Sequence, residues 1–346
     1  MIGLTLVTVV AVLGAGLRTT VESAVTDQIS AAYIVDGTDG APFEAAEGNA
    51  LARVPGVKTA SHVRNDKAIV GGEERDVTGV DPATIGQFYT FDWTKGSDAT
   101  VARLGQGGAL VTKTYADDKN LVVGKRLSIE TASGDKRNVV VAGIYDPPEI
   151  EQMLGDVTIG QEGFDAVFPQ PKNRFTFIDA PPEASADLAA VAGGFSDATF
   201  HTGAAFAKDY TADFASFLQM LYVLLAFSVI VSLFGMVNTL VLSVFERTRE
   251  LGMLRTIGMT RRQARRMIRH ESVITALIGA ALGLPLGIFL AGLVTQALAK
   301  YDIAFSIPIP QLVAFTIVAI LAGLAAAIMP ARRASRLNVL DALHYE

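Results

Sequence analysis

Histidine, cysteine and serine are the side chains through which this 346-residue chain would be expected to carry out metal or nucleophilic chemistry. The chain has no cysteine, which excludes thiolate ligands, thiol nucleophiles and disulfides. Its four histidines, His62, His201, His270 and His344, lie far apart, and none has a carboxylate at the spacing of a metal-binding motif. No G-x-S-x-G motif and no P-loop motif is present. The sequence therefore predicts no catalytic residue, no metal site and no ATP hydrolysis by this chain, and the histidines are interpreted as surface or packing residues.

The most unusual charged stretch is residues 246–270, ERTRELGMLRTIGMTRRQARRMIRH, which contains eight arginines and two glutamates between two strongly apolar segments. One arginine at the centre of a bilayer costs about 3 kcal/mol even on insertion scales. We therefore expect this stretch to lie outside the hydrocarbon core. Because cytoplasmic loops of membrane proteins carry an excess of Lys and Arg, we expect it on the cytoplasmic side.

This stretch has an internal pattern of its own. Leu251, Leu254 and Ile257 recur at helical spacing, and Gly258 followed by Thr260 is typical of a helix stop and a new N-cap. The pattern predicts two short helices separated at Gly258.

Two partners suit such a helix pair. A basic amphipathic helix lying on anionic lipid is one interpretation. Glu246 and Glu250 favour a protein interface instead, because an anionic lipid surface would repel their carboxylates.

Four apolar segments are long enough to position this loop at a membrane. A helix needs about 20 apolar residues to cross a hydrocarbon core of roughly 30 Å. Residues 214–245, 272–299 and 303–331 contain no charged residue, and residues 1–17 form a shorter apolar segment. A secretory signal is an alternative interpretation of residues 1–17, but they lack a basic leader and a convincing cleavage site. We interpret them as part of a transmembrane helix, and expect the chain to be a piece of a longer membrane protein or a shortened gene product.

Alternation of these segments places residues 27–213 outside the cell. This part holds 28 acidic and 16 basic residues and carries −12, whereas the rest of the chain carries +6, out of a total of −6. An acidic external domain with basic cytoplasmic edges does not suit nucleic-acid binding.

The external part reads as an α+β domain with mainly antiparallel sheets. Gly71–Gly72 and Ser133–Asp135 are typical of hairpin turns between strands. Short helices are expected at 43–53 and 183–192, and two subdomains with a break near 95–110. Aromatic residues at 88–93 are expected to pack in its core.

Gly279, Gly283 and Gly287 lie four residues apart within the third apolar segment. This spacing aligns them on one helix face and favours close contact with another helix. The alternative is that glycine is simply frequent in membrane helices.

The arginine-rich stretch and the C-terminal tail resemble those of a known family. ERTRELGMLRTIGMTRRQARRMI follows the pattern E-x-x-R-E-[IL]-G-x-L-[RK]-[AT]-[IL]-G-x-[ST]-[RK] of FtsX-like ABC transporter permeases of the MacB- and LolC-like type. The tail PARRASRLNVLDALHYE resembles the closing pattern of that family, with Val339 where the pattern usually has Pro. The resemblance is strong over 215–346 and loose in the external part, at 77–82 and 123–127.

The resemblance implies an α-helical membrane protein in the bacterial cytoplasmic membrane. It has four transmembrane helices and a large α+β extracytoplasmic domain between the first and the second. The expected parts are a first transmembrane helix at 1–26, an external domain at 27–213, a second helix at 214–245, a cytoplasmic coupling loop at 246–270, a third helix at 271–299, an external loop at 300–310, a fourth helix at 311–331 and a cytoplasmic tail at 332–346.

The resemblance also implies partners. In this family the loop after the second helix docks onto a separate P-loop ATPase subunit, which holds the ATP and magnesium, so no cofactor is expected in this chain. The matching contact residues are Glu246, Glu250, Leu251, Gly252, Leu254, Arg255 and Gly258. A second permease copy or half and membrane lipids are the other expected partners, and homodimer and heterodimer both remain open.

The implied function is a permease subunit that couples ATP hydrolysis on its partner to movement of the external domain, for export or extraction of a lipid, lipoprotein or peptide. The alternative is a membrane regulator or sensor of cell-envelope processes, such as the activation of cell-wall hydrolases, without transport. A membrane enzyme acting through residues 27–213 is a third class, for which no catalytic constellation is found.

The expected orientation is testable because the chain has no native cysteine. A cysteine introduced at Ser133 should react with a membrane-impermeant maleimide on intact cells, and one introduced at Thr260 should react only after lysis. Labelling in the opposite order would show that the arginine-rich loop lies outside the cell.

Overall fold

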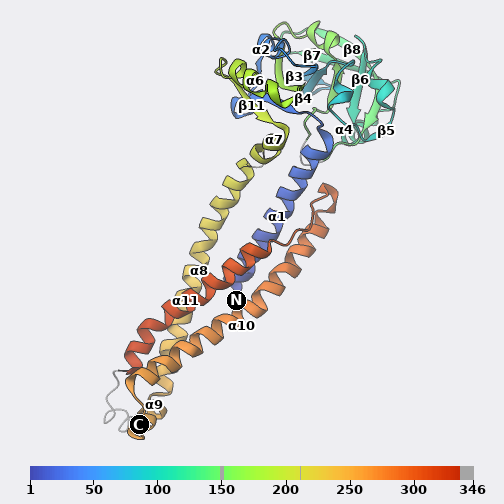
Figure 1. Ribbon diagram of the computed structural model, residues 1–346. Helices are drawn as coiled ribbons and strands as arrows, with labels where there is room; N and C mark the ends of the chain where they lie inside the picture. Colours follow the sequence, from blue (N-terminus) through green and yellow to red (C-terminus); the bar gives the residue numbers. More distant parts are fainter. Residues whose placement is uncertain (149–151, 211, 336–346) are drawn as a thin grey trace. The chain divides into compact units, whose positions relative to one another are not determined.

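The computed structural model describes residues 1–148, 152–210 and 212–335, and the chain divides into two compact units (Figure 1). The helical unit comprises Met1–Thr20 and the chain from Asp213 onward. The external domain comprises Val21–Ala212. Each unit is described by itself below.

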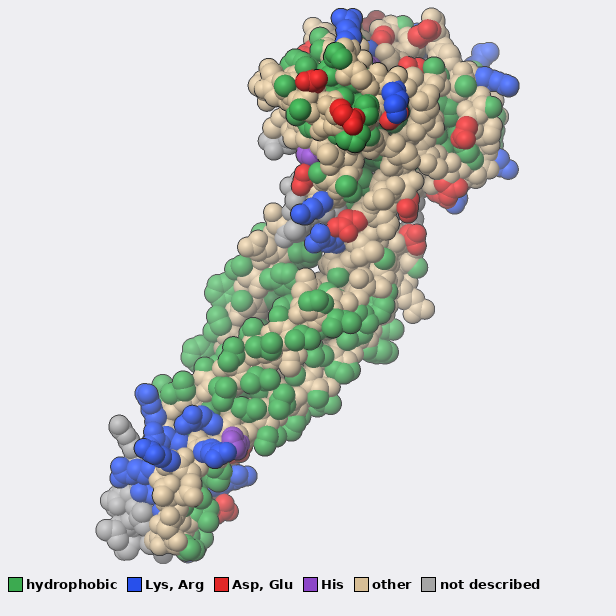
Figure 2. All heavy atoms as spheres, viewed as in Figure 1, with side chains coloured by type: hydrophobic (Ala, Val, Ile, Leu, Met, Phe, Trp, Pro, Cys, Tyr) green, Lys and Arg blue, Asp and Glu red, His purple; other side chains and the backbone are tan. Residues whose placement is uncertain are grey.

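Four long helices make up most of the helical unit. They are α1 (Ile2–Gln28), α8 (Ala212–Glu246), α10 (Arg261–Ala297) and α11 (Ile309–Ser335). Each contains a stretch that is long and apolar enough to cross a membrane. Apolar side chains cover the surface of these helices in Figure 2. The expected fold class, four such helices with an α+β domain inserted between the first and the second, is confirmed.

The loop between α8 and α10 contains one short helix, α9 (Thr248–Thr256). Gly258 follows it with φ of 112°, a conformation that favours glycine, and Thr260 is the N-cap of the next helix. The predicted break is therefore confirmed, but the expected second short helix is not. Residues 261–278 contain neither glycine nor proline, so the helix that begins at Arg261 continues without interruption into the membrane span.

The remaining elements belong mainly to the external domain. Its strands are β1 (Tyr33–Gly37), β2 (Phe43–Glu44), β3 (Thr59–Val70), β4 (Glu73–Val80), β5 (Trp93–Lys95), β6 (Gly108–Thr112), β7 (Arg126–Thr131), β8 (Lys136–Tyr145), β9 (Val157–Gly160), β10 (Lys172–Asp179) and β11 (Ala198–Thr202). Its α-helices are α2 (Ala45–Leu51), α3 (Asp98–Val101), α4 (Lys113–Lys119), α5 (Gln161–Asp165), α6 (Ser185–Ala192) and α7 (Gly203–Tyr210). Single 3₁₀ turns lie at Thr38–Gly40, Ile85–Gln87 and Pro182–Ala184, and a fourth, Ala299–Tyr301, follows α10.

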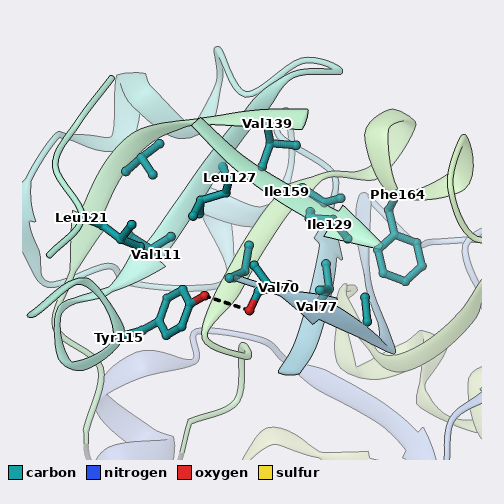
Figure 3. Packing of buried hydrophobic residues seen from close by; sticks show 14 of the residues in the cluster. Val70, Val77, Val111, Tyr115, Leu121, Leu127, Ile129, Val139, Ile159 and Phe164 are labelled. Carbon is teal, nitrogen blue, oxygen red and sulfur yellow. Dashed lines mark hydrogen bonds between the residues drawn. The ribbon is translucent and has the colours of Figure 1, made fainter. Parts of the chain in front are cut away.

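Six strands of the external domain close into a barrel in the order β3, β4, β9, β6, β8, β7 and back to β3. The β4–β9 and β6–β8 pairs are parallel and the other four are antiparallel. Alternate residues of these strands point inward and fill the interior with branched aliphatic side chains, among them Val70, Val111 and Ile129 (Figure 3). The hydroxyl of Tyr115 donates to the carbonyl of Val70 at 3.4 Å, which satisfies a buried polar group next to this core.

An open sheet extends from the same barrel through β3. Its strands run β3, β10, β1, β11, all antiparallel. Because the twelve-residue β3 belongs to both the barrel and the open sheet, the external domain is one compact unit. The expected break near 95–110 is therefore wrong, since that region holds β5, α3 and the turn into β6 of the barrel.

Local turn chemistry agrees with the sequence. Gly71 and Gly72 connect β3 to β4 with φ of 62° and 91°, as a two-residue hairpin requires, and β7 and β8 form the second expected hairpin. Phe88, Tyr89 and Phe91 are buried in one cluster with Trp93 packed against it, which confirms the expected core role of these aromatic residues.

Phe164 gives a direct test of the barrel core. It is fully buried and stacks on Phe168 with ring centroids 4.2 Å apart. Phe164→Ala should lower the free energy of unfolding of the external domain by about 3–5 kcal/mol, because it removes a buried ring and leaves a cavity. Trp93, the single tryptophan, lies in this domain, so its fluorescence during urea titration reports on this unit alone.

The matched control is Val123→Ala, which shortens a half-exposed apolar side chain in the same domain. It should change the unfolding free energy by less than about 0.5 kcal/mol. Equal effects of the two substitutions would contradict the packing described for Phe164.

Candidate functional site

The helix α9 packs onto the helical unit through the buried side chain of Leu251. Leu251 is only 4% exposed and packs in a cluster with Val244 of α8, Ile268 of α10 and Ala331 of α11. Gly252, the next residue, is also buried. Both residues were predicted to contact the ATPase partner; in this structure they are buried within the chain, and their contact with a partner stays a prediction. Their position makes Leu251 the anchor through which α9 is attached to three long helices.

The other expected contact residues divide between two faces. Glu246, Glu250, Leu254 and Gly258 are exposed, and Arg255 is partly buried. Sequence spacing had grouped Leu251 with Leu254 in one stripe, but only Leu251 faces the chain's own core.

An exposed face remains on the outer side of α9, formed by Glu250, Met253, Leu254 and Ile257, and is called the docking face below. Ile257 is 84% exposed and Met253 and Leu254 are more than 40% exposed. Three adjacent apolar side chains in a polar loop form an unusual surface, because such groups are normally withdrawn from water. A carboxylate stands beside them at Glu250.

Positive charge gathers at the end of the helical unit that carries α9 (Figure 2). Figure 2 shows Lys and Arg side chains gathered over the end of the helical unit that carries α9 and the start of α10. Arg247 pairs with Glu271 at 3.7 Å, which connects the start of the loop to α10. The first turn of α10 is capped by neutral groups, since Thr260 N donates to Gln263 Oε1 at 2.8 Å and Gln263 N donates to Thr260 Oγ1 at 3.3 Å.

The three glycines expected in helix packing lie along one side of α10 at different depths. A Cβ at Gly287 would lie 2.6 Å from the Cβ of Thr8, and one at Gly283 would lie 3.4 Å from Thr5 Oγ1. At Gly279 the nearest atom would be 3.6 Å away, an ordinary contact. Thr5 Oγ1 also donates to the carbonyl of Gly283 at 3.3 Å. The close approach of α1 to α10 therefore depends most on Gly287.

A similar small-residue contact joins α10 to α11. Ser272, which is fully buried, donates from Oγ to the carbonyl of Gly323 at 2.6 Å. A Cβ at Gly323 would lie 3.1 Å from the Cβ of Ala276. Because a bilayer offers no water to a polar group, this internal hydrogen bond stabilises the helix pair.

His201 of the external domain makes contacts with two carboxylates that the sequence did not indicate. His201 Nε2 lies 3.0 Å from Asp36 Oδ1, and Nδ1 lies 3.2 Å from Asp209 Oδ2. Its hydrogen bond to Asp36 raises the pKa of His201, and partial burial opposes the shift. Asp36 is 165 residues away in sequence, so no local spacing could have indicated this contact.

The other histidines do not form such a group. His62 Nδ1 lies 3.1 Å from Thr176 Oγ1, and burial lowers the pKa of His62. His270 is exposed near the start of α10, and His344 lies outside the described residues.

One carboxyl in the domain is strongly perturbed. Burial, together with a hydrogen bond to Asp197, raises the pKa of Glu47 to about 7. Within residues 1–148, 152–210 and 212–335, no group of three or more His, Asp or Glu side chains is arranged to hold a metal ion.

Two protein-family models match the chain. The model described as MacB-like periplasmic core domain matches residues 1–193, more than half of the chain, and the model described as FtsX-like permease C-terminal matches residues 222–339.

Curated proteins resemble the chain over part of its length. The macrolide export ATP-binding/permease protein MacB of Escherichia coli (strain K12) is 36% identical over 133 residues, which cover 37% of this chain and 20% of that protein. The pyoverdine export ATP-binding/permease protein PvdT of Pseudomonas putida is 32% identical over 127 residues, which cover 37% of this chain and 19% of that protein. The matches thus span about a fifth of the length of these relatives.

Solved structures of external domains are similar at low identity. The periplasmic region of MacB from Actinobacillus actinomycetemcomitans gives a TM-score of 0.37 at 9% identity and covers 53% of this chain and 94% of that chain. The extracellular domain of the noncanonic ABC-type transporter YknZ from Gram-positive bacteria gives a TM-score of 0.34 at 12% identity and covers 49% of this chain and 100% of that chain.

The glycine positions along α10 give an internally matched pair of variants. Gly287→Ala should destabilise the protein by about 1–3 kcal/mol, because the added methyl group collides with Thr8. Gly279→Ala should be neutral or stabilise by about 0.5–1 kcal/mol, because the added methyl group makes only an ordinary contact and alanine favours the helix. Thermal unfolding in detergent, followed by helical circular dichroism, measures both, and an equal loss for the two variants would contradict the packing of α1 on α10.

Proposed function

The chain belongs to the FtsX-like permease family, with a MacB-like periplasmic core domain as its external part, and on that basis we propose that it is the permease subunit of an ABC transporter whose ATP is hydrolysed by a separate P-loop ATPase. The observation that carries the proposal is the docking face of α9, an exposed apolar surface on a helix that is itself firmly anchored.

The docking face suits a protein groove better than water or lipid. Met253, Leu254 and Ile257 bury their apolar surface when a partner covers them, at about 25 cal/mol per Å² removed from water. Glu250 beside them favours a partner with a basic group at the rim and disfavours an anionic membrane surface. ATP and magnesium would be held by the partner, and this chain supplies the contact.

The anchor explains how a movement of the partner would be passed on. A partner that displaces α9 also displaces Leu251, which is packed between α8, α10 and α11. Packed interiors have low compressibility, so this displacement moves the helices instead of being absorbed in the contact.

The helix α8 both crosses the membrane and leads toward the external domain. α8 has 35 residues and is therefore about 52 Å long, well beyond a hydrocarbon core of about 30 Å. Its N-terminal end at Ala212 follows α7, which belongs to the external domain. Work done on α9 would reach the external domain through this continuous rod.

The task performed outside is export or extraction of a lipid, lipoprotein or peptide. The names of two relatives refer to macrolide export and pyoverdine export, and both relatives are much longer than the matched segment. A second permease copy or half would complete the assembly.

The docking face is tested by co-purification. Ile257→Asp and Glu250→Lys should each reduce recovery of a P-loop ATPase with the affinity-tagged permease at least about tenfold, since a central interface residue contributes about 2 kcal/mol. Quantitative mass spectrometry of the purified complex measures the recovery.

Glu183→Lys is the matched control, because it makes the same charge change at an external position. Recovery of the ATPase should then equal that of the unmodified chain. Full recovery with both Ile257→Asp and Glu250→Lys would exclude the docking face as the contact.

A further inference from the structure

His201 occupies a junction between the edge of the open sheet and the helix that leads to α8. It lies on β11, opposite Ile34 of β1, and its side chain is 13% exposed. Asp36 belongs to β1 and is also largely buried, whereas Asp209 belongs to α7 and is 57% exposed. The ring therefore connects three elements of the external domain.

The chemistry of the ring decides which protonation state fits this arrangement. Both ring nitrogens lie within 3.2 Å of a carboxylate oxygen. A neutral imidazole has one N–H and can donate to only one of them, so its other nitrogen would present a lone pair to the second carboxylate. Only the imidazolium donates to both carboxylates at once.

The surroundings of His201 contain few other charges. Asp36 from β1 and Asp209 from α7 are the charged groups that act on its pKa among the described residues. Phe206 of α7 packs edge-on against the ring at 5.7 Å, and Phe206 in turn contacts Phe175 of β10. Lys208 is the next charged residue on α7 and has an interaction of its own.

We propose that His201 is a protonation-dependent positioning residue, which in its charged form holds α7 against the β1–β11 edge and so fixes the segment from which α8 begins. α7 has eight residues and one fully buried side chain, Phe206. A helix this short depends on tertiary contacts, which include the burial of Phe206, the packing of Tyr210 and the contact of Asp209 with His201. Losing the contact with His201 would therefore let its C-terminal end move more freely.

The direction of the pH effect follows from the environment. Asp36 raises the pKa of His201 above its ordinary value of 6.5. The contact is therefore fully formed below pH 6.5 and is lost as the pH rises through the raised value. The external domain is exposed to the pH outside the cell, so α7 would be released when that pH is alkaline.

The consequence for transport rests on the proposed function. If α8 conveys movement from the cytoplasmic side, a released α7 would yield instead of passing that movement to the sheet. The external domain would then respond to the ATPase more strongly at mildly acidic pH than at alkaline pH. The contact of His201 with Asp36 and Asp209 is called the clasp below. It forms within the external domain and does not require an ATPase.

Hydrogen–deuterium exchange of the full chain in detergent tests the clasp without any partner. After correction for the intrinsic pH dependence of exchange, amides of residues 203–210 should exchange about threefold to fivefold faster at pH 9 than at pH 6, the factor expected for a partly exposed charged contact. His201→Gln, which keeps one donor but cannot become charged, and Asp209→Asn should both show the fast exchange at pH 6.

His270→Gln removes an exposed histidine of the helical unit and should keep the pH response of residues 203–210. Unchanged Trp93 emission in every variant shows that the external domain is folded. Equal corrected exchange at pH 6 and pH 9 in the unmodified chain, or an unaltered response in His201→Gln, would overturn the clasp. Full ATPase recovery with both Ile257→Asp and Glu250→Lys, together with an intact clasp, would contradict only the proposed function.

Discussion

The burial of Leu251 is the contact on which the cytoplasmic end of this protein depends. Its side chain is enclosed by residues of α8, α10 and α11 and so attaches the short α9 to three helices. The Arg247–Glu271 pair is a second link between the loop and α10. An isolated nine-residue helix would be marginally stable in water, and this tertiary contact is what supports it. The same contact fixes which side of α9 faces outward, and it leaves Met253, Leu254 and Ile257 available to a partner.

Within the membrane, small residues take the role that large apolar residues have in water-soluble cores. Lipid tails are as apolar as leucine, so helices associate through close packing and internal hydrogen bonds. The contacts of Ser272 with Gly323 and of Thr5 with Gly283 are of this kind. Helices held by such contacts can move together, because van der Waals attraction weakens steeply when the two surfaces separate.

Sequence patterns predicted the features that depend on neighbouring residues. The absence of charge predicted the membrane spans, Gly71–Gly72 predicted a hairpin, and Gly258 with Thr260 predicted the end of one helix and the start of another. The features that depend on distant pairings were not predictable. Closure of the barrel requires Val70 of β3 to meet Ile129 of β7, and the inward orientation of Leu251 requires α11 to return to the cytoplasmic side. The ties between His201, Asp36 and Asp209 likewise form only once β1, β11 and α7 have been brought together.

The external domain contains a closed barrel and a less extensively paired junction at β11 and α7. A movement of the helices would be absorbed at the junction more readily than in the barrel. The barrel is closed, so none of its six strands can slide without breaking hydrogen bonds on both sides. By contrast, β11 is paired on one side only, with β1, and α7 follows it directly. If α8 transmits movement, as proposed above, that movement reaches β11 through α7. Phe206 resists it through apolar burial, which does not depend on pH, while His201 resists it through charge, which does. On the proposal above, the apolar packing of α7 sets the stiffness of this junction and the proton on His201 adjusts it.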